Sequence, residues 1–75
     1  MNVYTIRCTT TQDAEATRRA FEAVGFPYRN VKSPNLRNAG QFETDSDPGA
    51  TLRRFGLRVR GSRYELRAEL KGVGQ

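Results

Sequence analysis

The sequence predicts a small α/β domain in which a strand, a helix, a strand, a helix and two final strands follow one another. Two patterns carry this prediction. Residues 3–8 alternate in polarity and lead directly into a helical pattern over 11–24, and residues 57–70 alternate again around a Gly-Ser pair. Alternation with a period of two indicates strands, whereas apolar residues spaced three and four apart indicate a helix.

The first half of the chain predicts a strand–helix–strand unit. Residues 3–8 are rich in β-branched and aromatic side chains, which favours a strand with apolar residues on both faces. Thr10 or Thr11 can cap the helix with its hydroxyl, and Gly25 can end it. Residues 26–31 predict the second strand. Because the connections are short, we expect the two strands to be parallel neighbours joined by a right-handed crossover.

The second half predicts a short helix and a hairpin. Asp47 and Pro48 are typical of a helix start, with Asp47 as N-cap, and Gly56 can close the helix. In residues 57–70 apolar and charged side chains alternate, and the Gly-Ser pair at 61–62 predicts a tight turn of the II′ kind. One face of the hairpin is then apolar and the other charged.

A polar segment, 33–46, joins the two halves and is predicted to be a long loop that is either a recognition loop or a plain connection. Residues 41–44 can instead form a short strand. The alternative fold is then a ferredoxin-like βαββαβ sandwich, provided that the last hairpin acts as less than two full strands. Residues 72–75 are expected to fray, and residues 1–75 to form one domain.

Composition excludes several function classes. The chain has no histidine and one cysteine, which argues against a zinc site and rules out a Ser–His or Cys–His catalytic pair. We expect no metal and no cofactor. We also expect a cytoplasmic protein without a signal peptide or membrane span, since no apolar run approaches ~20 residues. With 36% hydrophobic residues the core is small, so a partner or a homodimer could add stability.

The positive charge is concentrated near the C-terminus. Residues 1–48 balance six basic against six acidic side chains, whereas residues 49–75 carry seven basic and two acidic ones and hold the whole net charge of +5. Eleven of the thirteen basic residues are arginine, whose planar fork suits phosphate and carboxylate groups. The candidate binding residues are Arg53, Arg54, Arg58, Arg60, Arg63 and Arg67.

These arginines also have structural explanations. Glu65 and Glu69 share the charged face of the predicted hairpin, so that face is equally explained as solvated surface with charged edges. Arg53 and Arg54 can complement the dipole at the end of the short helix. The predicted charged face carries no aromatic residue for base stacking. The leading interpretation is a non-catalytic binding or regulatory module that engages an acidic protein or nucleic acid, like many small accessory factors of phages and mobile elements.

The segment 2–31 resembles the first βαβ unit of glutaredoxin-like redoxins, which have a thioredoxin-like fold. The matching residues are Val3-Tyr4-Thr5, Cys8, the Ala-Thr-Arg-Arg-Ala-Phe run at 16–21, Gly25-Phe26, Tyr28 and Val31. The resemblance implies a monothiol redox protein in which Cys8 attacks mixed disulfides. Thr11 stands where the family has its second cysteine, and no proline precedes Leu57, where the family has a cis-proline.

Cys8 therefore has two explanations. At the start of a helix its thiol would be activated by the free N–H groups and the dipole. In the core it would be a small hydrophobic residue, and Tyr4 and Ile6 on the same face of the predicted strand favour that role. The monothiol redox protein is accordingly the alternative function, and the anion-binding module is the leading one.

Overall fold

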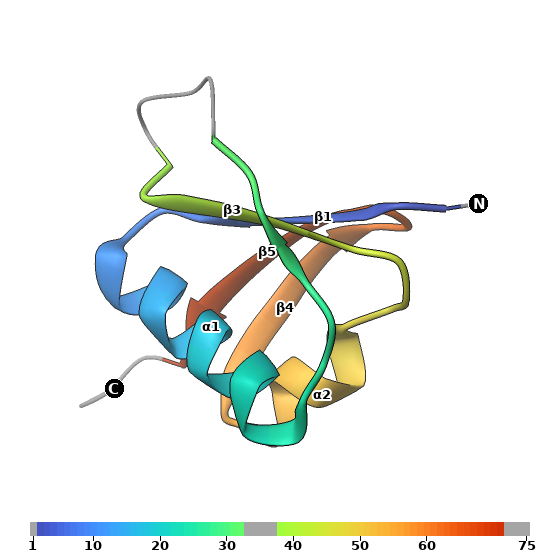
Figure 1. Cartoon of the computed structure of the whole chain (residues 1–75). Coiled ribbons are helices and arrows are strands. Elements are labelled where there is room, and N and C mark those ends of the chain that lie inside the picture. The colour runs from blue at the N-terminus through green and yellow to red at the C-terminus, as the bar shows by residue number, and fades with distance from the viewer. Residues whose placement is uncertain (1, 33–37, 72–75) are drawn as a thin grey trace.

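The computed structural model describes residues 2–32 and 38–71, which form two helices on one face of a five-stranded sheet (Figure 1). The predicted α/β class is therefore confirmed. The sheet order is β2-β3-β1-β5-β4. The elements are β1 (Tyr4–Cys8), α1 (Thr11–Val24), β2 (Arg29–Asn30), β3 (Gly40–Thr44), α2 (Gly49–Arg54), β4 (Leu57–Ser62) and β5 (Glu65–Leu70).

β1 is the central strand of a mixed sheet. It pairs antiparallel with β3, where Ile6 lies opposite Phe42, and parallel with β5, where Ile6 lies opposite Leu66. The predicted parallel pairing of residues 3–8 with 26–31 is wrong, because β2 has two residues and pairs only with β3 at the edge of the sheet. β3 pairs with β1 over five residues and buries Phe42. The two residues of β2 are exposed, and they follow Pro27, which has no N–H to donate.

The predicted element order lacked one strand, because β3 occupies part of the segment predicted as a loop. The optional strand at 41–44 is confirmed, while residues 33–37 of that loop and the predicted tail 72–75 lie outside the described residues. The ferredoxin-like alternative also required a reduced final hairpin. The first six elements do follow the βαββαβ order of that alternative. However, β4 and β5 are two full six-residue strands, and β5 lies between β1 and β4, so the sheet departs from it.

The turn of the β4–β5 hairpin lies at residues 63–64, two residues later than predicted. Gly61 and Ser62 belong to β4 and not to the turn. Polarity alternation cannot separate these two registers, because a shift by an even number of residues leaves the same side chains facing the core. In the observed register the Tyr64 ring meets Tyr4 edge-on, with 5.1 Å between ring centroids.

α1 has the predicted bounds, and its ends are set by local contacts. The Thr10 hydroxyl accepts the N–H of Asp13 at 3.0 Å, and Gly25 ends the helix with a φ of 69°. The Asp13 side chain also reaches the sheet, where its Oδ1 accepts the Leu70 N–H at 2.8 Å. This bond ties the first turn of α1 to the end of β5.

α2 begins close to the predicted start. The helix runs from Gly49, so its N-cap is Pro48 and not the predicted Asp47. The Asp47 carboxylate still accepts the Gly49 N–H at 2.9 Å, from one residue before the cap. Gly56 follows the helix with a φ of 83°. Leu52 is the side chain that α2 buries in the core.

The core lies between the helices and the sheet, and Phe21 of α1 is its largest fully buried side chain. The Phe21 ring stacks on Phe26 and on Tyr28 with centroid distances of 5.2 Å, and it meets Phe42 edge-on at 6.2 Å. The remaining buried hydrophobic residues around it are Ile6, Cys8, Ala20, Leu52, Leu57 and Ala68.

Candidate anion-binding site

The face of the sheet opposite the helices carries the charged side chains. Alternate residues of a strand point to opposite faces, so the neighbours of the buried Ile6, Leu57 and Ala68 point away from the core. No helix in the described residues covers this side (Figure 1). We call it the open face, and its members on β1, β3, β4 and β5 are Thr5, Arg7, Gln41, Glu43, Arg58, Arg60, Ser62, Glu65, Arg67 and Glu69.

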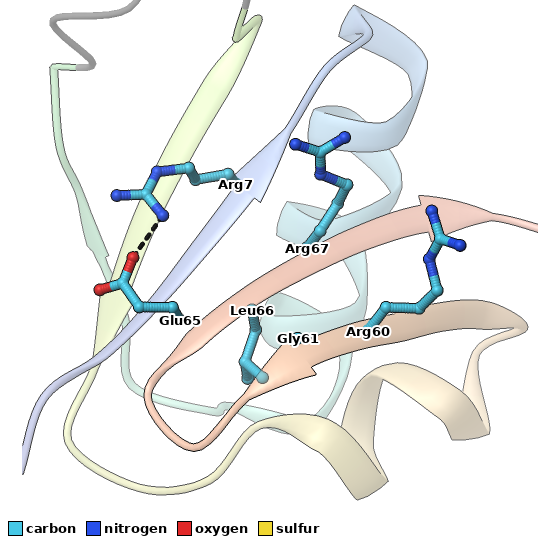
Figure 2. Close-up of a pocket in the computed structure, with 6 residues that line it drawn as sticks. All are labelled: Arg7, Arg60, Gly61, Glu65, Leu66 and Arg67. Carbon is cyan, nitrogen blue, oxygen red and sulfur yellow. Dashed lines mark hydrogen bonds and ion pairs between the residues drawn. The ribbon is translucent and has the colours of Figure 1, made fainter.

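Three arginines stand side by side on the open face (Figure 2). Arg7 of β1 lies opposite Arg67 of β5, and Arg67 lies opposite Arg60 of β4. Neighbouring strands are about 4.8 Å apart, so three cations start from main-chain positions within about 10 Å. Like charges directly opposite each other destabilise a sheet. We call this set the arginine row.

β5 also supplies two carboxylates that hold the outer arginines. Glu65 pairs with Arg7 (Figure 2), and Glu69 Oε1 lies 3.3 Å from Nε of Arg60. Arg67 lies between these two glutamates on the same strand, and it is exposed. Within 2–32 and 38–71, it makes no ion pair or hydrogen bond through its side chain. The guanidinium of Arg67 therefore has its donors available for a ligand.

The arginine row borders an open cavity of about 270 Å³. Gly61 contributes main chain to its wall, with a φ of 131°. A Cβ at this position would lie 2.1 Å from the carbonyl oxygen of Glu65, so only glycine lets the two strands approach this closely. The lining residues are Arg7, Arg60, Gly61, Glu65, Leu66 and Arg67 (Figure 2).

The six predicted binding arginines do not form one surface. Arg58, Arg60 and Arg67 are exposed on the open face, and Arg63 lies in the β4–β5 turn with a φ of 40°. The other two, at 53 and 54, lie on α2, on the helix side of the sheet.

Arg7 completes the row, and the sequence interpretation missed it. Its outward position could have been inferred, since Ile6 and Cys8 on either side are buried strand residues. Its position beside Arg67 could not have been inferred, because it depends on the parallel pairing of β1 with β5.

Cys8 lies in the core. Its exposed fraction is 0%, and its Sγ lies 3.4 Å from the hydroxyl oxygen of Thr17. Burial raises the pKa of the Cys8 thiol, and the hydrogen bond with Thr17 offsets this only in part. A neutral thiol enclosed by the core has the properties of a structural residue and not of a nucleophile.

We expect Cys8 to react with Ellman's reagent at least about 100-fold more slowly in the native protein than in urea, because both the thiolate and access to it depend on opening of the core. The unfolded protein supplies the reference rate, measured at the same pH. Rapid native reaction would contradict the burial of Cys8 and would support the redox alternative.

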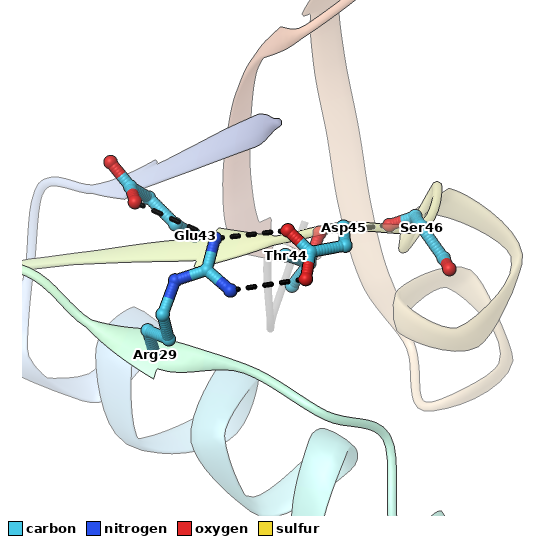
Figure 3. Close-up of polar contacts among 5 residues, drawn as sticks. All are labelled: Arg29, Glu43, Thr44, Asp45 and Ser46. Carbon is cyan, nitrogen blue, oxygen red and sulfur yellow. Dashed lines mark hydrogen bonds and ion pairs between the residues drawn. The ribbon is translucent and has the colours of Figure 1, made fainter. Parts of the chain in front are cut away.

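Arg29 occupies the opposite edge of the sheet and is already paired (Figure 3). Its Nη1 and Nη2 donate to the two carboxylate oxygens of Asp45 at 3.2 and 3.1 Å, and Glu43 Oε1 lies 3.7 Å from Nη2. The Thr44 hydroxyl donates to the Ser46 carbonyl at 2.8 Å, which fixes the turn that carries Asp45. Arg29 is therefore engaged by carboxylates at the β2 edge of the sheet and does not extend the arginine row.

The Arg29–Asp45 pair predicts a dependence of stability on pH. The hydrogen bond from Arg29 lowers the pKa of Asp45 below its usual value. A carboxyl group with a lowered pKa in the folded state stabilises the fold above its unfolded pKa of about 4, and this contribution is lost as the pH falls through the folded pKa. We expect Asp45→Asn to lower Tm slightly at pH 7, since the pair is exposed, and to lower it less at pH 2. Thermal melts followed by circular dichroism test this, and an equal Tm difference at both pH values would contradict it.

No family model, curated protein or solved structure matches this chain. In the part of the chain that the structure describes, no helix is long and apolar enough to cross a membrane. The same residues contain no cluster of three acidic or thiol side chains that could hold a metal ion.

Proposed function

We propose that this protein is a non-catalytic binding module that engages an anionic partner through the arginine row. The opposition of Arg7, Arg67 and Arg60 on three neighbouring strands is the observation that carries this proposal. Like charges opposed in this way repel one another and destabilise the sheet. An oxyanion bound over Arg67 would offset that repulsion and accept charge-assisted hydrogen bonds from the guanidinium groups.

The lining of the cavity supports binding and not catalysis. Among its described residues, Glu65 is the single group that could act as a base, and it is paired with Arg7. Arg58 and Arg63 lie at the margins of the same surface and extend its positive charge, whereas the arginines of α2 lie too far round the molecule to join it.

A carboxymethyl cation exchanger tests the proposal with a simple carboxylate partner. We expect Arg67→Gln to elute at lower NaCl concentration than Arg54→Gln, although both substitutions remove one positive charge. Arg54 on α2 is exposed and distant from the row, so it controls for net charge. Co-elution of the two variants would argue against a role for the row.

Arg67→Gln should also leave the fold intact. Because Arg67 has like charges on both sides and no carboxylate partner among the described residues, we expect its replacement to leave Tm unchanged or to raise it slightly. A thermal melt of the variant used on the column checks this. A marked fall in Tm would mean that Arg67 is a structural residue.

The redoxin resemblance of residues 2–31 remains a hypothesis about origin. The bounds of α1 agree with it, whereas the place of β3 between β1 and β2 departs from the redoxin-like order expected from the sequence. Cys8 is fully buried, and burial raises its pKa more than the contact with Thr17 lowers it, so its surroundings do not favour a redox function.

A further inference from the structure

Two glutamates restrict what the arginine row can hold. Along β5 the open face presents Glu65, Arg67 and Glu69, each two residues from the next, or about 7 Å apart. The side chain of Glu65 is 59% exposed and that of Glu69 is 27% exposed, so both carboxylates can repel an anion that approaches the surface. Any ligand on Arg67 therefore has a negative charge on either side along the strand.

The charges of this cluster fit one negative group. Three arginines and two glutamates leave a single positive charge without a counterpart, and the unpaired guanidinium of Arg67 is where it lies. One carboxylate would balance it and could take two parallel hydrogen bonds from the guanidinium. Arg7 and Arg60, each held by a glutamate, retain further N–H groups that could contribute.

We infer that the partner is a protein that presents an isolated carboxylate side chain to Arg67, and that Glu65 and Glu69 exclude a nucleic-acid backbone. This inference rests on the proposed function and specifies its partner. The cavity of about 270 Å³ beside Arg67 admits a side chain.

A nucleic-acid strand does not match this pattern of charge. It carries phosphates at short, regular intervals, so in a strand that runs along β5 the phosphates next to one bound at Arg67 would lie near Glu65 and Glu69. In a strand that crosses the sheet they would lie over Arg7 and Arg60, whose charges these glutamates already balance. These charges fall within the ~10 Å over which repulsion is felt at 0.1 M salt. Among the open-face residues defined above there is also no aromatic ring on which a base could stack.

A protein surface can match the same pattern. Its acidic side chains are separated by neutral or basic ones, and a lysine or arginine on either side of the inserted carboxylate could pair with Glu65 and Glu69. Such alternation across an interface favours the right partner and repels the wrong one.

Two dye-labelled probes test the inference by fluorescence anisotropy at 50 mM NaCl. One is a 12-residue Gly-Ser peptide with a glutamate at every fourth position, and the other is a 12-nucleotide oligothymidine. We expect the natural protein to bind the peptide more tightly, and Arg67→Gln to weaken that binding. In the double variant Glu65→Gln/Glu69→Gln, oligothymidine affinity should rise at least about tenfold, with a smaller change for the peptide.

The matched control is Glu15→Gln/Glu22→Gln on α1, which changes the net charge equally but away from the open face. Tighter binding of oligothymidine than of the peptide by the natural protein would overturn the inference and leave the anion-binding function standing. An equal gain in oligothymidine affinity in Glu65→Gln/Glu69→Gln and in the α1 control would overturn the inference in the same way. If the natural protein binds neither probe, or Arg67→Gln changes neither affinity, the proposed function itself fails.

Discussion

Gly61→Ala is expected to lower the free energy of unfolding by about 3 kcal/mol or more. Gly61 has a φ of 131°, which side chains other than hydrogen rarely allow, and an added Cβ would lie 2.1 Å from the Glu65 carbonyl oxygen and 3.0 Å from the Leu66 Cα. These are main-chain atoms of the paired strand. Relief of the clash therefore requires the β4–β5 ladder to separate.

Urea unfolding followed by circular dichroism measures this loss, with Gly25→Ala as the matched control. Gly25 also has a positive φ, of 69°, but nothing lies within 4 Å of its added Cβ. Its replacement should cost about 1 kcal/mol from backbone strain alone. Equal losses in the two variants would show that close approach of the strands at Gly61 is unimportant. Gly61→Ala should also weaken retention on the carboxymethyl column, because it distorts the wall of the cavity.

Phe21→Ala is expected to lower the free energy of unfolding by about 3–5 kcal/mol. The side chain is fully buried, and its ring contacts those of Phe26, Tyr28 and Phe42. Domains of this size have a total stability of only about 4–11 kcal/mol, so the variant should be largely unfolded in modest urea.

Phe55→Ala is the control for this second substitution. Phe55 is 44% exposed at the end of α2, so we expect its loss to cost less than about 1 kcal/mol. Urea titrations of both variants give the comparison. A loss below 1 kcal/mol for Phe21→Ala would mean that the aromatic cluster is not the centre of the core.

Features fixed by neighbouring residues could be predicted from the sequence. The bounds of α1 follow from a threonine hydroxyl at one end and a glycine at the other, and the Asp47-Pro48 pair predicted the start of α2 to within one residue. These contacts join residues two or three apart in the chain. The burial of Cys8 was likewise favoured by its place beside Ile6 on one strand face.

Features fixed by strand pairing could not be predicted in the same way. The short β3 displaced the expected neighbour of β1, and the hairpin turn moved by two residues without changing which side chains face the core. The arginine row depends on both outcomes. Arg60 meets Arg67 only in the observed register, and Arg7 joins them only because β1 is parallel to β5.

The central place of β1 also determines when the site comes into existence. Arg7 and Glu65, which pair across β1 and β5, are 58 residues apart, and β4 reaches the rest of the sheet only through β5. Closing so long a loop is slow, and it must follow synthesis of the last strand. A nascent or truncated chain that lacks β5 carries Arg7 and Arg60 but not Arg67, and it has no strand to join β4 to β1. We therefore expect carboxylate binding to report completed folding, and to be absent from any earlier intermediate.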